Sequence, residues 1–264
     1  MQTTPFLASP FTFLFLLLML AHCASQNEWY IDQLAEQGPC NIEVRDSASL
    51  SQREFIDVYA YTKPVIISYN DDWNKVFQSE CSKENMLKKY GEKIIRLSSA
   101  NTHSYRKRDV TLQYYVEELL KPQDLDTLGN ETFYWFGDNN HTEWKELFDL
   151  YKKPHLSLPG KEGMYSFGMA GAGTGVPFHW HGPGFGEVVY GRKRWFLFPP
   201  DKMPYFNPDR TTLYWLINDY QEIHPAELPL ECTLKPGQVI YFPNRWWHAT
   251  LNLDTSIFIS TFLG

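Results

Sequence analysis

The sequence predicts a mainly β protein with additional helices (α+β class), built on a double-stranded β-helix of the jelly-roll type. From residue 164 onward, short apolar runs alternate with Gly and Pro, a spacing typical of sandwiches and barrels. Before residue 164, helix signals alternate with short apolar strands, which predicts an α/β part packed on the β-helix. Residues 26–264 contain no linker or internal repeat, so we expect one domain, whose 164–264 half carries the histidine motif.

The N-terminal part begins with a helix. Ser51 and Glu54 form a capping box, which predicts a helix over residues 52–60, and Pro64 breaks it. Two further helices are expected at 83–90 and 111–120, with short strands at 65–68 and 94–97.

The C-terminal half consists mainly of short strands. An irregular helical insertion is expected over 208–220. The predicted strands are 164–170, 176–181, 187–190, 194–198, 239–242, 247–253 and 256–262.

The first 25 residues predict a signal peptide. The apolar run from Phe11 to Ala21 is too short for a transmembrane helix, which needs about 20 residues, and is followed by small residues that suit cleavage. Because no Lys or Arg precedes the run, an uncleaved anchor is the alternative. We expect a location in the secretory pathway, in the lumen of the endoplasmic reticulum, without a C-terminal retrieval signal and without a membrane span after cleavage.

The composition is that of a folded protein: 43% of the residues are hydrophobic and 16% are aromatic. The net charge of −7 argues against a nucleic-acid binder. The two short basic runs, 106–108 and 192–194, do not change this, because such runs are usually solvated turns. Proteins are the expected partners, and self-association is left open.

Sequons and cysteines fit the secretory interpretation. Asn130 and Asn140 each begin an Asn-x-Thr sequon in a polar stretch and are candidate glycosylation sites. Cleavage of the leader leaves three cysteines, which predicts one disulfide and one free thiol. The sequence leaves the pairing open; Cys40 with Cys81 is the expected pair, because both lie in the N-terminal part.

Three histidines form the candidate site. His179 and His181 stand two residues apart, so on a strand both side chains point to the same face. His248 lies on a later predicted strand and can complete a metal site inside the barrel. The alternative is that these histidines are hydrogen-bonded interior residues that bind no metal.

Several segments resemble a JmjC domain when they are taken together in order. Residues 177–181 with 190–200 resemble its first metal-binding half, and 236–243 with 246–254 resemble its second half. Phe55, the strand at 63–67 and the region of Trp135 also fit, so the resemblance covers most of 42–264. It implies a cupin-like fold and similarity to Fe(II)- and 2-oxoglutarate-dependent oxygenases that hydroxylate protein side chains or demethylate lysine.

The resemblance also implies roles for individual residues. It places the metal ligands at His179, His181 and His248, and a cation for 2-oxoglutarate at Lys193. Hydroxyl groups that help to hold this co-substrate are expected at Thr174 and Ser260. Where close relatives carry a polar Asn, this chain has Gly186, so the co-substrate pocket matches the pattern only in part.

The decisive departure is His181, because this position carries a carboxylate in the family. Neutral imidazole in place of a carboxylate raises the formal charge of the metal centre by one unit. Three His still bind divalent metals such as Fe(II) or Zn(II). The sequence therefore favours a regulatory or signalling protein that binds other proteins and has reduced or lost oxygenase activity. The alternative is an active protein hydroxylase with a three-His iron site, retaining Lys193 and Ser260.

Overall fold

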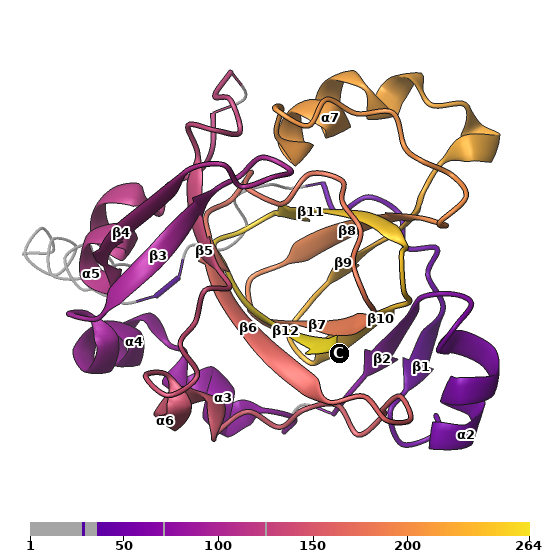
Figure 1. Cartoon of the computed structure of the whole chain (residues 1–264), viewed down its shortest axis with the longest axis horizontal. Helices are drawn as coiled ribbons and strands as arrows, with labels where there is room; N and C mark the ends of the chain where they lie inside the picture. The colour runs from indigo at the N-terminus through magenta and orange to yellow at the C-terminus, as the bar shows by residue number, and fades with distance from the viewer. Residues whose placement is uncertain (1–27, 30–35, 71, 125) are drawn as a thin grey trace, which may run out of the picture.

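The computed structural model describes residues 28–29 and 36–264, except 71 and 125 (Figure 1). The expected signal peptide, at 1–25, lies outside the described residues. Two sheets face each other and form the barrel of a jelly roll. The larger sheet contains, in spatial order, β1 (Val44–Asp46), β2 (Val65–Ser68), β10 (Gln238–Phe242), β7 (Gly184–Tyr190), β12 (Ser256–Leu263), β6 (Gly163–Ala170), β5 (Phe133–Phe136), β3 (Ile94–Ser99) and β4 (Lys107–Thr111). The smaller sheet contains β11 (Trp247–Asn252), β8 (Lys193–Phe198) and β9 (Leu230–Leu234).

The helices cover the outside of this barrel. The α-helices are α2 (Gln52–Glu54), α3 (Lys75–Glu80), α4 (Lys83–Tyr90), α5 (Leu112–Tyr114), α6 (Lys145–Phe148) and α7 (Thr212–Asn218). π-Helical turns at Phe55–Tyr59 and Tyr115–Leu119 continue α2 and α5, and 3₁₀ turns at Tyr220–Glu222 and Pro225–Glu227 follow α7. In the described part of the chain, none of these helices is long and apolar enough to cross a membrane.

The expected N-terminal helices are confirmed, and their caps explain where they begin. The Ser51 hydroxyl accepts a hydrogen bond from the Glu54 N–H at 3.2 Å, and the Ser82 hydroxyl accepts one from the Asn85 N–H at 3.3 Å. Such bonds satisfy N–H groups that have no partner within the helix. The helix expected at 208–220 is α7, which lies at one end of the barrel (Figure 1).

Alternation along β12 separates an inner face of the barrel from an outer face. Phe258, Ser260 and Phe262 line the interior, whereas Ile257 and Ile259 pack into an apolar cluster on the outside. Two-residue periodicity requires this division. The interior therefore contains the candidate site, and the outer cluster attaches the helices to the larger sheet.

The strand expected at 176–181 is not formed. The segment instead runs beside β11, and its one β-bridge joins His179 to His248. Pro177 has no N–H to donate, so a continuous ladder cannot develop through this segment. The expectation that His179 and His181 lie on one strand is therefore wrong, although both side chains still line the same pocket.

The expected Cys40–Cys81 disulfide is also wrong, because Cys40 pairs with Cys232. The segment before β1 runs along β9, where the Asn41 N–H donates to the Glu231 carbonyl at 3.0 Å, and this places Cys40 beside Cys232. Cys81 is a free thiol, fully buried in the outer apolar cluster.

Mass spectrometry of a non-reduced digest should show a Cys40 peptide linked to a Cys232 peptide, with Cys81 alkylated only after unfolding. Because the bond closes a loop over 192 residues, its removal in Cys40→Ser/Cys232→Ser should lower the free energy of unfolding by roughly 2–5 kcal/mol in urea. Recovery of a Cys40–Cys81 peptide would contradict this assignment.

Candidate metal centre

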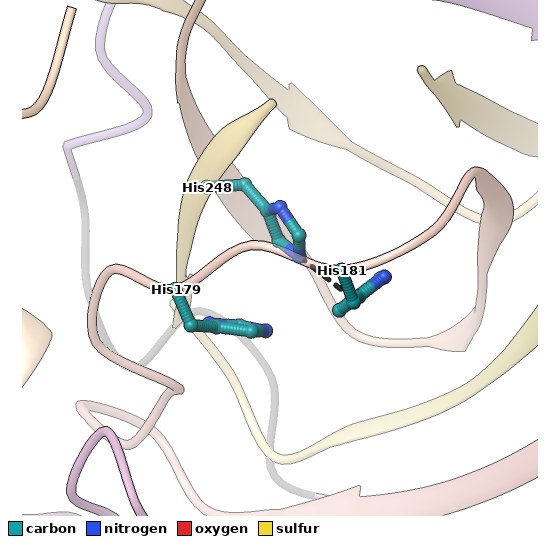
Figure 2. Close-up of side chains that lie close together, drawn as sticks. All are labelled: His179, His181 and His248. Atoms are coloured by element: carbon teal, nitrogen blue, oxygen red, sulfur yellow. Dashed lines mark hydrogen bonds between the residues drawn. The ribbon is translucent and has the colours of Figure 1, made fainter. Parts of the chain in front are cut away.

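Three histidines converge at the barrel interior (Figure 2). His248 comes from β11, and His179 and His181 come from the loop that precedes β7. One ligand nitrogen from each ring lies within 4.8 Å of the other two. Backbone bonds fix this approach, since the His179 and His248 main chains exchange N–H···O bonds of 3.1 and 2.9 Å.

The protonation of the three rings leaves a free lone pair on each inner nitrogen. Nδ1 of His179 contacts the Pro177 carbonyl at 2.8 Å, and Nδ1 of His248 contacts the Trp246 carbonyl at 2.9 Å. Nδ1 of His181 contacts the Gly182 carbonyl at 2.7 Å. A carbonyl only accepts, so every Nδ1 must carry the proton. Each Nε2 is therefore available to a metal, because a carbonyl that holds the Nδ1–H fixes the tautomer of the ring.

Two of these lone pairs face each other at short range. His248 Nε2 lies 3.1 Å from His181 Nε2 (dashed line in Figure 2), and in the Nδ1–H tautomers neither nitrogen carries a proton. Protonating the rings is unfavourable: burial lowers the pKa of His179 to about 4 and lowers that of His248 well below its ordinary value. A bound divalent cation would remove the repulsion, so the residues present fit a metal ion.

The pocket around the histidines is largely aromatic. Its free volume is about 30 Å³, equivalent to roughly one or two water molecules. The other lining residues are Phe136, Val176, Lys193, Trp195, Phe242, Thr250, Phe258, Ser260 and Phe262. Sequence reasoning missed the aromatic residues and Thr250; two-residue alternation from His248 and Ser260 would have found Thr250, Phe258 and Phe262.

Lys193 and Ser260 line the same pocket as the histidines, whereas Thr174 does not. Lys193 is 4% exposed, and its ammonium donates to Asn252 Oδ1 at 3.0 Å. The Asn252 amide donates in turn to the Thr174 carbonyl at 3.0 Å and hydroxyl at 3.1 Å. Thr174 therefore orients Asn252, which holds Lys193. The sequence-based interpretation of 192–194 as a solvated turn is wrong, because Lys193 and Arg194 are both buried.

An aromatic ring covers the Lys193 ammonium. Nζ lies 3.7 Å from the centre of the Phe258 ring, a cation–π contact. Burial lowers the pKa of Lys193 to about 7. At Gly186, an added Cβ would lie 2.7 Å from Cζ2 of Trp195, so this indole fills the space that a larger residue would need.

No carboxylate joins the histidine group within the described ranges. Glu187 lies on the opposite face of β7 from Gly186, and its carboxylate is bound outside the barrel. It accepts hydrogen bonds from Asn74 at 3.0 Å and from the Tyr151 hydroxyl at 2.9 Å. Asp201 lies on an outer groove. Neither acid reaches the metal position.

Removal of one ligand should abolish tight metal binding. In titrations with Co(II) or Zn(II), His248→Ala should weaken affinity by roughly 100-fold or more, because even outer-shell partners are worth about 10- to 100-fold. His103→Ala, an exposed histidine outside the group, is the matched control and should bind like the wild type. Unchanged stoichiometric binding in His248→Ala would contradict a three-histidine centre.

Glu187 should make stability depend on pH. Burial raises its pKa from the ordinary 4.5 to about 7, so the folded state favours the protonated acid. Its contribution is fully present below about pH 4.5 and is lost as pH rises through 7. The free energy of unfolding in urea should therefore fall between pH 5 and pH 8, and this fall should be roughly 2–3 kcal/mol larger for the wild type than for Glu187→Gln. Parallel profiles for the two proteins would contradict a raised pKa.

Comparison with known proteins places the chain in a family. A family model described as a cupin-like domain matches residues 51–262. The human JmjC domain-containing protein 8 is 56% identical over 231 residues, which cover 88% of this chain and 86% of the human protein. The rat protein of the same name is 57% identical over 229 residues, covering 87% and 84%. Lysine-specific demethylase JMJ21 of Arabidopsis thaliana is 29% identical over 83% of this chain but only 25% of its own length.

Solved structures support the same fold. The E. coli ycfD structure matches 82% of this chain and 53% of its own, at 18% identity, with a TM-score of 0.52. A structure of that ribosomal oxygenase with cobalt and 2-oxoglutarate matches 81% of this chain and 52% of its own, at 16% identity, with a TM-score of 0.51. At this identity the likeness concerns the fold alone. The sequence relatives and the family model together show that the chain belongs to the cupin-like JmjC domain family.

Proposed function

We propose that this protein keeps the JmjC fold and a three-histidine centre that can hold a metal ion, but has reduced or lost oxygenase activity. In this proposal it acts by binding proteins in a regulatory or signalling role. The observation that carries the proposal is the filling of the pocket beside the three histidines by aromatic side chains. Free volume of about 30 Å³ does not accommodate a five-carbon dicarboxylate such as 2-oxoglutarate without movement of these rings.

The expected co-substrate cation is already engaged. Lys193 contacts Asn252 and the face of Phe258, so an incoming carboxylate would have to displace the ring before it could pair with the ammonium. Desolvation also lowers the pKa of Lys193 to about 7, and part of the population is then uncharged near neutral pH. Both effects weaken binding of an anionic co-substrate.

The metal centre is altered as well. Replacement of a carboxylate by His181 leaves three neutral ligands, so a divalent ion there keeps its full formal charge. An electron-rich carboxylate favours oxidation of iron, and its loss disfavours that step. We therefore propose that the centre holds Zn(II) or Fe(II) mainly as a structural ion.

The second candidate is an active Fe(II)- and 2-oxoglutarate-dependent protein hydroxylase with a three-histidine site. It is favoured by the presence of Lys193 and Ser260 in the same pocket as all three histidines. A fold relative whose structure holds cobalt and 2-oxoglutarate adds support at the level of the fold. This candidate requires Phe258 to move when the co-substrate binds.

Succinate production separates the two candidates. Wild-type protein loaded anaerobically with Fe(II) and then given 2-oxoglutarate and O₂ should form no succinate above a protein-free control. His181→Asp alone should also be inactive, because Lys193 stays covered; His181→Asp/Phe258→Leu should gain 2-oxoglutarate binding. His181→Asp/Phe262→Leu is the control, because it changes a lining ring that packs against residue 181, whereas Phe258 lies over Lys193.

Two results would overturn the proposal. Wild-type turnover that His248→Ala abolishes would establish the active hydroxylase. Equal 2-oxoglutarate binding by the Phe258→Leu and Phe262→Leu double variants would show that the Phe258 ring over Lys193 is not the reason for inactivity.

We also propose that the protein resides in the secretory pathway, in the lumen of the endoplasmic reticulum. The apolar leader, the sequons and a disulfide that joins Cys40 to Cys232 support this location. Asn140 suits a glycan, because it is exposed and its Oδ1 accepts from the Thr142 N–H at 3.0 Å. Asn130 suits one poorly, because its Oδ1 is buried.

Glycosidase treatment of protein expressed in mammalian cells should remove a mass equal to one N-glycan. Asn140→Gln should abolish this shift, whereas Asn130→Gln should leave it unchanged, because the Asn130 side chain is partly enclosed in the folded protein. A shift that corresponds to two glycans, or one that is lost with Asn130→Gln, would contradict the assignment.

A further inference from the structure

The disulfide of this protein joins an exposed residue to a buried one. Cys40 is exposed, whereas Cys232 is 4% exposed. Cys232 belongs to the apolar cluster that contains Trp195 and Phe242, two residues that also line the histidine pocket. Trp195 is its partner in the ladder between β8 and β9. One end of the bond therefore faces solvent, and the other end is enclosed by the barrel.

This asymmetry decides which sulfur a thiolate can attack. In thiol–disulfide exchange the attacking sulfur approaches in line with the S–S bond, from the side opposite the sulfur that leaves, and access limits the rate. An attack on Cys40 comes from solvent, whereas an attack on Cys232 would have to come through the packed apolar cluster. Exchange should therefore begin at Cys40 and release the thiol of Cys232.

The segment 37–41 covers a buried ion pair. Arg194 is 2% exposed and Glu231 is 1% exposed, and Nη2 of Arg194 lies 2.5 Å from Oε2 of Glu231. Gly38 lies directly over the guanidinium, since a Cβ at this position would be 2.1 Å from Cζ of Arg194. Tyr220, in the turn after α7, donates its hydroxyl proton to the same carboxylate. Departure of the segment would admit water to both charges.

Hydrogen bonds also hold this covering segment. The Asn41 N–H donates to the Glu231 carbonyl at 3.0 Å, and the Asn41 Oδ1 accepts from the Glu231 N–H at 2.6 Å. The Thr233 hydroxyl donates to the Gln37 carbonyl at 2.6 Å. Because water can replace each partner, these bonds contribute little net stability once the disulfide is broken. Ile42 follows with 4% exposure and anchors the chain in the apolar cluster, so the release ends there.

We propose that Cys40 is a site of thiol–disulfide exchange, and that breaking its bond to Cys232 uncovers the ion pair of Arg194 and Glu231 while the barrel stays folded. A thiol of another molecule, RSH, loses its proton, and its sulfur forms a bond to Cys40. The electron pair of the broken S–S bond stays on the sulfur of Cys232, which takes up a proton. A second RSH attacks the mixed disulfide and releases RSSR, so two thiols are oxidised and the protein disulfide is reduced.

Glutathione is the probe for the first step. Native protein incubated with reduced glutathione, then quenched with acid, alkylated and digested, should carry glutathione on Cys40 and an alkyl group on Cys232. Oxidised glutathione should modify Cys232→Ser, which keeps the Cys40 thiol, at least about 10-fold faster than Cys40→Ser, which keeps the enclosed thiol. Cys81, a fully buried free thiol, is the internal control and should stay unmodified in both variants. Glutathione on Cys232 of the wild type, or equal rates for the two variants, would contradict attack at Cys40.

Labelling of arginine side chains with phenylglyoxal tests the uncovering. Reduction by dithiothreitol should make Arg194 react about 10-fold faster or more, because an enclosed group reacts only in the open fraction of molecules. Arg192, whose guanidinium is 12% exposed and pairs with Asp254 at 2.8 Å, is the matched control and should keep its rate.

A variant without the disulfide separates its reduction from other effects of the reagent. In Cys40→Ser/Cys232→Ser, Arg194 should react at the fast rate with or without dithiothreitol. Three results would overturn the proposal: no acceleration at Arg194 in the reduced wild type, equal acceleration at Arg192, which indicates general unfolding, or exchange with glutathione only after unfolding in urea.

Discussion

Backbone pairing between residues 173–181 and β11 is the constraint on which the candidate centre depends. Asn252 N–H donates to the Thr174 carbonyl at 2.8 Å, Thr250 N–H to Val176 at 2.9 Å, and His248 N–H to His179 at 2.9 Å. Gly175 permits this contact, because a Cβ there would lie 1.7 Å from the Thr250 carbonyl oxygen. Histidines that are far apart in sequence are therefore brought together by main-chain bonds, and their rings need no metal to be placed.

The same constraint explains which parts of the site the sequence could predict. Residue type and family pattern indicated His179, His181, His248 and Lys193, and all four line one pocket. His179 and His181 were expected to share a face because of strand periodicity, but they do not lie on a strand, because Pro177 interrupts pairing. The aromatic filling was not predicted, because the sequence alone does not distinguish Trp195, Phe258 and Phe262 from ordinary core residues. Only the packing of the two sheets places them around the histidines.

Elements with local signals were the most predictable parts of the fold. Ser82 caps α4, and the helix has the bounds that its sequence predicts, Lys83–Tyr90. β9 and β4 lack such signals: β9 contains Glu231, which is buried and pairs with Arg194 at 2.5 Å, and β4 begins in a basic run. The disulfide shows the same limit. Cys40 meets Cys232 through the path of the chain beside β9, which neither cysteine's sequence neighbours reveal.

The position of this disulfide has a consequence for the exposed edge of the smaller sheet. β9 is an outer strand of the three-stranded sheet, and unpaired outer strands are templates for pairing with other chains. The segment 37–41 covers it: Asn41 pairs with Glu231, the Thr233 hydroxyl donates to the Gln37 carbonyl at 2.6 Å, and the sulfur bridge ties the segment down. Oxidation thus fixes a covering segment over the β9 margin of the small sheet. A chain folded under reducing conditions has this margin protected only by hydrogen bonds.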